Sequence, residues 1–292
     1  MDTIVVGVDG SEASFEALRW AVDEGRRRHW SVKAVLAWTF PNMVPVLGHF
    51  SDPAWLQDQA EQRLDEWLRQ ELADAADVVV TRDVRQGSPA GVLLDAARDA
   101  RLLVVGSHGR DGFSSFVLGS VSQQCAHHAR CPVMIIRPED SSREGRAERA
   151  TPRVVVGVDG SQTARSALRW ALDEARLRHA AVDVVHAWQM PYRNGYPVSM
   201  LELPAADLEK CARRLLDGAV GGADTTGVKD VESILVCDSP ARALLDTAKD
   251  ADLLVVGSRG HGGFAGLLLG SVGQKVLHHA TCPVVIIPSA PD

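Results

Sequence analysis

Glycine and serine recur at one fixed spacing in two separate parts of this 292-residue chain. The first set comprises Gly106, Gly109, Gly119 and Ser120, and the second comprises Gly257, Gly260, Gly270 and Ser271. Glycines let a backbone come close to an anion and aim several N–H groups at it. A helix that begins at the last glycine adds the positive end of its dipole. This spacing of residue types therefore predicts two phosphate-binding loops.

These loops belong to a duplication that extends over almost the whole chain, and a long repeat of this kind indicates a duplicated domain. The residues from Val5 to Ser11 return as Val155 to Ser161. Later, the run His-His-Ala-x-Cys-Pro-Val starts at His127 and returns at His278. We predict two domains, residues 1–137 and 153–288, joined by a linker at 138–152 that is rich in charge and serine.

Each copy alternates strand-like and helix-like patterns, and these elements must position the loops. In the first copy the expected strands cover residues 4–8, 32–38, 78–84, 102–105 and 133–136. Helices are expected after Ser11, from about 53 to 75, from Ser88-Pro89, and from Gly119-Ser120. Five strands alternating with about four helices predict a doubly wound parallel α/β sheet in each copy. In such sheets ligands bind beyond the carboxyl ends of the strands, which points to the loops after Val8 and Val105.

The pattern Gly-x2-Gly-x9-Gly-Ser, after a Val-Gly-Val-Asp start, resembles the nucleotide-binding branch of the universal stress protein family. The resemblance covers nearly the whole chain, twice, and the tandem layout looks like the actinobacterial form of that family. It implies the adenine nucleotide alpha hydrolase-like fold. It also implies one adenine nucleotide per domain, ATP together with Mg²⁺, in a regulatory module of the stress response.

The same resemblance assigns binding roles to individual residues. Asp9 and its neighbours would line the adenosine part, Ala37 would meet adenine through its backbone, and the glycine loop would wrap the ribose and phosphates. In the first copy the expected ATP contacts are Gly7, Val8, Asp9, Ala37, Gly106, Gly109, Gly119, Ser120, Val121 and Ser122. In the second copy they are Gly157, Val158, Asp159, Ala187, Gly257, Gly260, Gly270, Ser271 and Val272.

The two copies differ at positions that bear on affinity. Ser122 is replaced by Gly273, which removes one possible hydroxyl contact, and His108 is replaced by Arg259. Ser120 and Ser271 could cap a helix or bind a phosphate oxygen. Trp38 and Trp188, which follow the proposed adenine contacts, could wall the pocket or pack in the core.

Other functions stay open on the sequence alone. A glycine after a strand is often a plain turn, and an Asp there is often a helix cap. One alternative is a slow ATPase, for which Asp9, Asp159, His108, Arg110 and Arg259 are the nearby candidates. No standard catalytic constellation emerges from them, so no catalytic residue is assigned. Another alternative is an adaptor or structural protein with vestigial nucleotide pockets.

Metal binding is not expected, although His-His pairs lie near Cys131 and Cys282. These histidines fall in the last turn of a predicted helix, where they interact well with the helix dipole. The spacing of known zinc sites is missing around them. We therefore interpret the pairs as structural.

Charge and composition narrow the range of partners and compartments. The formal net charge of −7 argues against nucleic acid, and no apolar stretch approaches the length of a membrane helix. Five cysteines without a visible disulfide framework favour the cytoplasm. By resemblance, the two domains would pair within the chain through the strands at 133–136 and 284–287. A homodimer and an unidentified protein partner are both compatible with this arrangement.

Overall fold

The fold was taken from a computed structural model, which describes residues 2–39, 53–73, 75, 77–109, 118–137, 151–190, 192–193, 196–197, 204–260 and 268–289. The chain divides into two compact units, Met1–Pro138 and Glu139–Asp292, called unit 1 and unit 2 below. Most of the predicted linker, residues 138–150, lies outside the described residues. Among the helices that the structure describes, none is long and apolar enough to cross a membrane.

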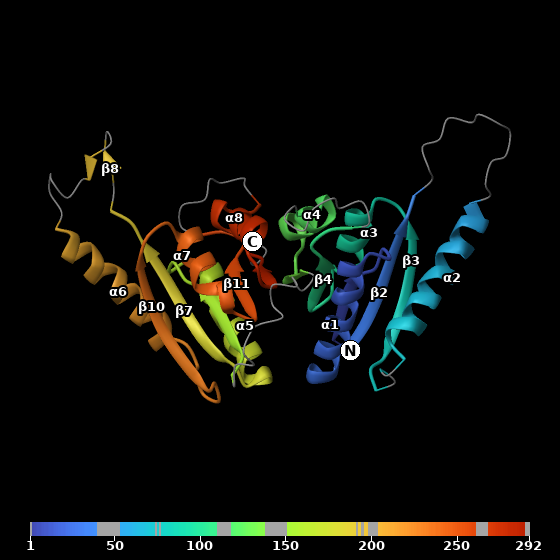
Figure 1. The fold of residues 1–292 in the computed structure, drawn as a ribbon, viewed down its shortest axis with the longest axis horizontal. Helices are drawn as coiled ribbons and strands as arrows, with labels where there is room; N and C mark the ends of the chain where they lie inside the picture. Colours follow the sequence, from blue (N-terminus) through green and yellow to red (C-terminus); the bar gives the residue numbers. More distant parts are fainter. Residues whose placement is uncertain are drawn as a thin grey trace. The chain divides into compact units, whose positions relative to one another are not determined.

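Unit 1 has the predicted doubly wound α/β architecture (Figure 1). Its elements are β1 (Thr3–Gly7), α1 (Glu12–Arg28), β2 (Ser31–Trp38), α2 (Pro53–Glu71), β3 (Val80–Gln86), α3 (Pro89–Ala96), β4 (Leu102–Gly106), α4 (Ser120–His128) and β5 (Val133–Ile136). The strands are all parallel, in the order β3-β2-β1-β4-β5. The strand order reverses between β1 and β4, which is where such sheets bind ligands.

Unit 2 repeats this architecture. Its elements are β6 (Arg153–Gly157), α5 (Gln162–Arg178), β7 (Ala181–Trp188), β8 (Tyr192–Arg193), β9 (Tyr196–Pro197), α6 (Ala205–Gly221), β10 (Asp230–Cys237), α7 (Pro240–Thr247), the short 3₁₀ helix η3 (Ala248–Asp250), β11 (Leu253–Gly257), α8 (Ser271–His279) and β12 (Val284–Ile287). The main strands are parallel in the order β10-β7-β6-β11-β12. The small antiparallel pair of β8 and β9 was not predicted from the sequence.

Local sequence explains why these elements form. The Ser11 hydroxyl caps α1 by accepting a hydrogen bond from the Ser14 amide at 3.2 Å. Along α1 a buried stripe that includes Ala17, Leu18 and Ala21 faces the sheet, as the helical period predicts. Strand β4 is buried at its first four residues, because helices cover both faces of a parallel sheet.

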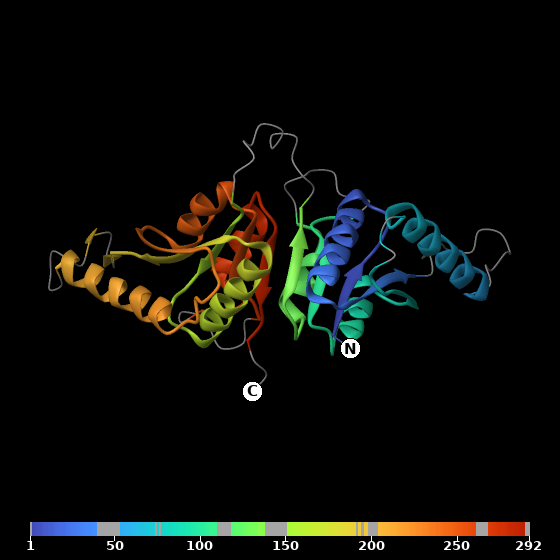
Figure 2. The same cartoon turned by 90° about the horizontal axis from the view of Figure 1, so that it is seen from below.

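The helices are divided between the two faces of each sheet, as right-handed crossovers require. In unit 1, α1 and α2 lie on one face and α3 lies on the other (Figure 2). Helix α3 contacts α4, which places that pair on the same side. In unit 2, α5 and α6 share one face and α7 lies on the opposite face. The connections at the carboxyl ends of the strands therefore converge at the strand reversal.

Candidate functional site

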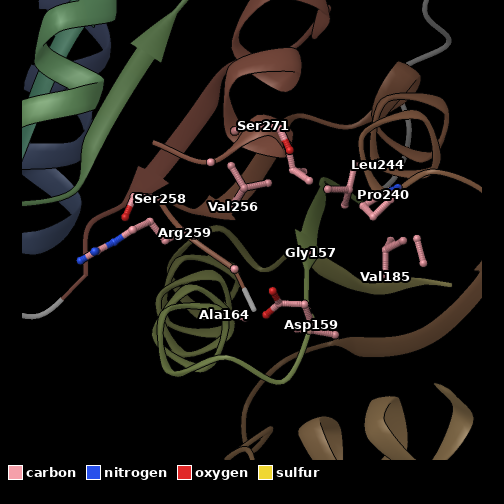
Figure 3. A pocket seen from close by; sticks show the side chains of 17 residues that line it. Gly157, Asp159, Ala164, Val185, Pro240, Leu244, Val256, Ser258, Arg259 and Ser271 are labelled. Carbon is pink, nitrogen blue, oxygen red and sulfur yellow. The ribbon is translucent and has the colours of Figure 1, made fainter. Parts of the chain in front are cut away.

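Unit 2 contains a cavity of about 560 Å³ at the carboxyl ends of β6, β7 and β11 (Figure 3). The cavity is lined by Gly157, Val158, Asp159, Ala164, Val185, Ala187, Pro240, Leu244, Val256, Gly257, Ser258, Arg259, Gly260, Gly270, Ser271, Val272 and Gly273. All the contacts predicted for the second copy, from Gly157 to Val272, are among them. Residues 100 positions apart in sequence meet here because β6 and β11 are neighbours in the sheet.

One end of the cavity is apolar. Val185 and Ala187 come from β7, and Pro240 and Leu244 come from the start of α7. Figure 3 shows Val185, Pro240 and Leu244 grouped on the same side of the cavity. Leu244 packs so closely on β6 that a Cβ added at Gly157 would lie 3.0 Å from its Cδ1. These four side chains, called the apolar slot below, form a surface of the kind that lines small-molecule sites.

Another part of the lining is made largely of backbone. The loop from Gly257 to Gly260 is held by the Gly270 amide, which donates to the Ser258 carbonyl at 2.7 Å. Helix α8 begins here with its first residues, Ser271 and Val272, facing the cavity. The first-turn amides of a helix have no acceptor within it, so this end presents N–H groups and the positive end of a dipole.

The structure tests one of the two roles that the sequence left open for the motif serines, helix capping. Gly270 occupies the N-cap position of α8, and no side chain makes a capping hydrogen bond there. Gly119 has the same position at α4. Ser120 and Ser271 are instead the first helical residues, so the capping alternative is wrong. Ser271 lines the cavity, and its hydroxyl is shown there in Figure 3.

Asp159 connects the loop after β6 with the glycine loop after β11. Its Oδ1 accepts a hydrogen bond from the Ser161 amide at 2.9 Å, which shapes the turn before α5. Its Oδ2 lies against the glycine loop, because a Cβ added at Gly260 would fall 2.3 Å from it. Asp159 therefore both stabilises the turn before α5 and lines the cavity.

Unit 1 brings its predicted residues together in the same way. Asp9 Oδ1 accepts from the Ser11 amide at 2.9 Å, and a Cβ at Gly109 would lie 2.7 Å from Asp9 Oδ2. The Gly119 amide donates to the Ser107 carbonyl at 2.7 Å, as its counterpart does in unit 2. The glycine loop of each copy therefore lies against the aspartate that follows the first strand.

Three of the seventeen lining positions carry a different residue in unit 1: Ser14 for Ala164, His108 for Arg259, and Ser122 for Gly273. Each unit 1 residue adds a hydrogen bond inside the site. The Ser14 hydroxyl accepts from the Asp9 amide at 3.3 Å, and His108 Nδ1 lies 2.9 Å from the Ser107 hydroxyl. The Ser122 hydroxyl donates to the Gly106 carbonyl at 2.6 Å. In this structure the predicted ligand contact of Ser122 is therefore engaged in joining α4 to β4.

Sequence reasoning missed the apolar slot and left the tryptophans undecided. Val185 and Ala187 alternate with Trp188 along β7, so the indole lies on the other face of the strand and is not among the lining residues. In unit 1 the Trp38 Nε1 donates to Gln57 of α2 at 2.5 Å. Alternation around Ala187 was the available signal for Val185. Nothing in the sequence pointed to Pro240 and Leu244.

Metal-ligating side chains are not clustered in the part of the chain that the structure describes. No group of three or more His, Cys, Asp or Glu side chains there is placed to hold a metal ion. Asp159 and Arg259 are the charged residues among the described lining residues.

Comparison with known proteins assigns the chain to a family. The model of the universal stress protein family matches residues 1–137 and 151–288. The universal stress protein Rv2623 of Mycobacterium tuberculosis is 33% identical over 293 residues, covering 97% of this chain and 95% of that protein. A crystal structure of a universal stress protein from Archaeoglobus fulgidus covers 98% of both chains with a TM-score of 0.69 at 20% identity, which shows the shared fold.

A third match is a universal stress protein solved in complex with cAMP. It is 31% identical, covers 48% of this chain and 98% of its own, and has a TM-score of 0.37. The family model covers both units, and the mycobacterial relative extends over nearly the whole chain. The chain therefore belongs to the universal stress protein family.

Proposed function

We propose that each unit binds one adenine nucleotide, ATP together with Mg²⁺, and that the chain is a regulatory module of the stress response. The observation that carries the proposal is the polarity of the unit 2 cavity. The lining combines the apolar side chains of Val185 and Leu244 with the glycine loop and the amide-bearing start of α8 at Ser271. A nucleotide has the same polarity, with an apolar base at one end and phosphates at the other.

The size of the cavity also supports a nucleotide. At about 560 Å³ it lies within the range typical of small-molecule sites. The base would lie against Pro240 and Leu244, near the backbone of Ala187. The phosphates would lie against the loop at Gly257 and Gly260 and the first turn of α8, because oriented amides and a helix N-terminus stabilise anions.

Asp159 fits the proposed Mg²⁺. It is the one carboxylate among the lining residues that the structure describes, and Mg²⁺ in proteins is commonly held by one or two carboxylates together with phosphates. When bound, the ion would neutralise phosphate charge. The role of Asp159 itself would be to hold the ion, directly or through water, while its Oδ1 keeps the turn before α5 in place.

Titration calorimetry of Mg-ATP into protein that absorbance shows to be free of nucleotide tests the proposal. We expect two sites per chain. Gly109→Glu should remove the unit 1 site and Gly260→Glu the unit 2 site, because each side chain would project into the space next to Asp9 or Asp159. Binding that persists at both sites in both variants would show that the phosphate loop is assigned wrongly. A complete lack of binding by the unmodified protein would favour an adaptor role.

Phosphate release by the same proteins separates binding from hydrolysis. A regulatory binding module should release no more phosphate than the double variant G109E/G260E. Turnover clearly above that control would favour the slow ATPase instead.

A further inference from the structure

One of the three lining positions that differ between the units changes the charge of the site as well as its hydrogen bonds. In unit 2 an arginine, Arg259, stands between Ser258 and Gly260 in the loop that the proposed function assigns to phosphate. In unit 1 the same position holds His108, whose ring is engaged with the hydroxyl of Ser107. Unit 2 therefore has a permanent cation before the second loop glycine, whereas unit 1 has its loop arginine, Arg110, directly after that glycine, where unit 2 has His261.

The Arg259 side chain is free of tight packing and can donate hydrogen bonds to an anion bound in the loop. It is exposed, and its Nε donates to the Ser289 hydroxyl at 2.8 Å. Figure 3 shows it leading away from Ser271 and Asp159, along the outer side of the loop. A hydrogen bond from a guanidinium to phosphate is stronger than one to a neutral hydroxyl, so a polyphosphate at this end of the cavity can displace Ser289 as the acceptor.

A second exchange adds another arginine close to the lining residues of unit 2. Arg165 donates from Nη1 to the carbonyl of Gly160 at 2.7 Å, directly after the lining residue Asp159. In unit 1 this position is Phe15, which packs edge-on against Trp67 with ring centroids 5.8 Å apart. An opposite exchange, Asp238 for Gly87, lies next to Pro240 at the apolar end and is paired with Arg242 at 3.5 Å.

We propose that the unit 2 site selects a polyphosphate ligand and that Arg259 is its specificity-determining residue. Arg259 would favour a nucleoside triphosphate over the monophosphate. The inference rests on the proposed function, since it concerns the ligand of the same site. Its physical basis is that each added phosphate brings negative charge toward the loop in which Arg259 stands between Ser258 and Gly260.

The experiment measures the ratio of the AMP and ATP dissociation constants for each unit alone. G109E blocks unit 1, so calorimetry of that protein with AMP, ADP and ATP in the presence of Mg²⁺ reports unit 2. Adding Arg259→His copies the unit 1 residue into unit 2, and Arg259→Lys keeps the charge without the fork of donors. Arg214→His makes the same exchange on α6, where the guanidinium contacts only the Lys210 carbonyl and the Cys211 sulfur in the described structure, and serves as the matched control.

We expect R259H to weaken ATP binding about tenfold more than AMP binding, a typical effect of losing one charge-assisted hydrogen bond. For R259K, the ratio of the AMP and ATP dissociation constants should lie between those of R259H and of the protein that keeps Arg259. R214H should leave this ratio unchanged. In the reciprocal G260E background, His108→Arg should raise the ratio at unit 1. Circular dichroism and the thermal midpoint establish that each variant is folded.

Two results would overturn the inference in different ways. If R259H changed AMP and ATP affinity equally, or changed neither, Arg259 would not determine specificity although the site binds nucleotide. If folded G109E protein bound none of the three nucleotides, the proposed function of unit 2 would fail, and this inference with it.

Discussion

The Asp159 carboxylate lies directly against the backbone of Gly260, so that a methyl group added at Gly260 would fall 2.3 Å from Asp159 Oδ2. Real Cβ atoms do not approach another atom so closely, and the carboxylate or the loop would have to move. The same relationship holds in unit 1 between Asp9 and Gly109, at 2.7 Å. In both units the aspartate after the first strand and the loop after the fourth are therefore a single structural feature.

Gly260→Ala should damage the site while sparing the fold. The methyl displaces either Asp159 or the loop, and we expect ATP affinity at unit 2 to fall about tenfold, since mispositioned contacts forfeit one or two hydrogen bonds. Gly260 is exposed, so the thermal midpoint should change little. Calorimetry and thermal unfolding measure the two effects separately.

Gly218→Ala is the matched control for that variant. Gly218 lies within α6, and a Cβ there would meet nothing within 4 Å. Alanine in a helix interior is favoured over glycine by roughly 0.5–1 kcal/mol, so this variant should be more stable and bind nucleotide normally. Equal loss of binding in both variants would contradict a specific role for Gly260.

The buried ion pair of α5 should be sensitive to the loss of one partner. Glu174 is fully buried and its carboxylate accepts a hydrogen bond from Arg178 one turn later. Arg178→Met would leave a buried carboxylate without this arginine, and we expect the free energy of unfolding to fall by about 3 kcal/mol.

Replacing both partners tests the cause of that loss. The double variant Glu174→Leu with Arg178→Met removes both charges of this pair and should recover most of the stability, as measured by urea unfolding. A double variant no more stable than Arg178→Met alone would show that packing, and not the loss of Arg178 beside the buried carboxylate, is responsible.

The residues that end α1 and α5 have a strained backbone conformation, which a substitution by glycine should relieve. His29 and His179 follow these helices with φ of 56° and 52°, the left-handed region that costs a residue with a Cβ about 1–2 kcal/mol. We expect His179→Gly to raise the free energy of unfolding by roughly 0.5–1 kcal/mol. The gain is smaller than the strain removed, because glycine loses more backbone entropy on folding than histidine does. Urea unfolding measures it, and a less stable variant would mean that the imidazole contributes more than the strain costs.

The cysteines should divide into two classes by reactivity. Burial raises the pKa of the Cys125 thiol to about 12 and that of Cys131 to about 11. At pH 8 both stay protonated and shielded, whereas Cys211 and Cys237 are exposed. A disulfide reagent under native conditions should therefore modify these two rapidly. Fast reaction of Cys125 or Cys131 would reveal opening of that part of unit 1.

The same shifts predict how stability depends on pH. A thiol whose pKa is raised in the folded state binds its proton more tightly there than in the unfolded chain. This stabilisation is fully present below the unfolded pKa of about 8.5 and is lost as the pH rises toward 11. Replacing both cysteines with alanine should flatten the fall in stability above pH 8.5, and an unchanged alkaline slope would contradict these shifts.

Much of the architecture could be predicted without coordinates because it depends on local rules. The duplicated segments, the alternation of strands and helices, and the caps at Ser11 and Ser161 are written in residue order and spacing. The predicted strands and helices of unit 1 match the observed ones to within a few residues. Every contact predicted for the second copy lines one cavity, although nucleotide binding there stays a prediction.

The sequence by itself determined the repeat, the parallel α/β class and the two glycine loops, because periodicity and glycine spacing act over short stretches of chain. Only the tertiary structure decided that Pro240 and Leu244 close the apolar end, that Trp188 faces away, and that the Ser122 hydroxyl binds the Gly106 carbonyl. It also decided that Asp159 meets Gly260. These relationships depend on which strands become neighbours and which face each side chain takes, and both are set by packing across the whole sheet rather than by adjacent residues.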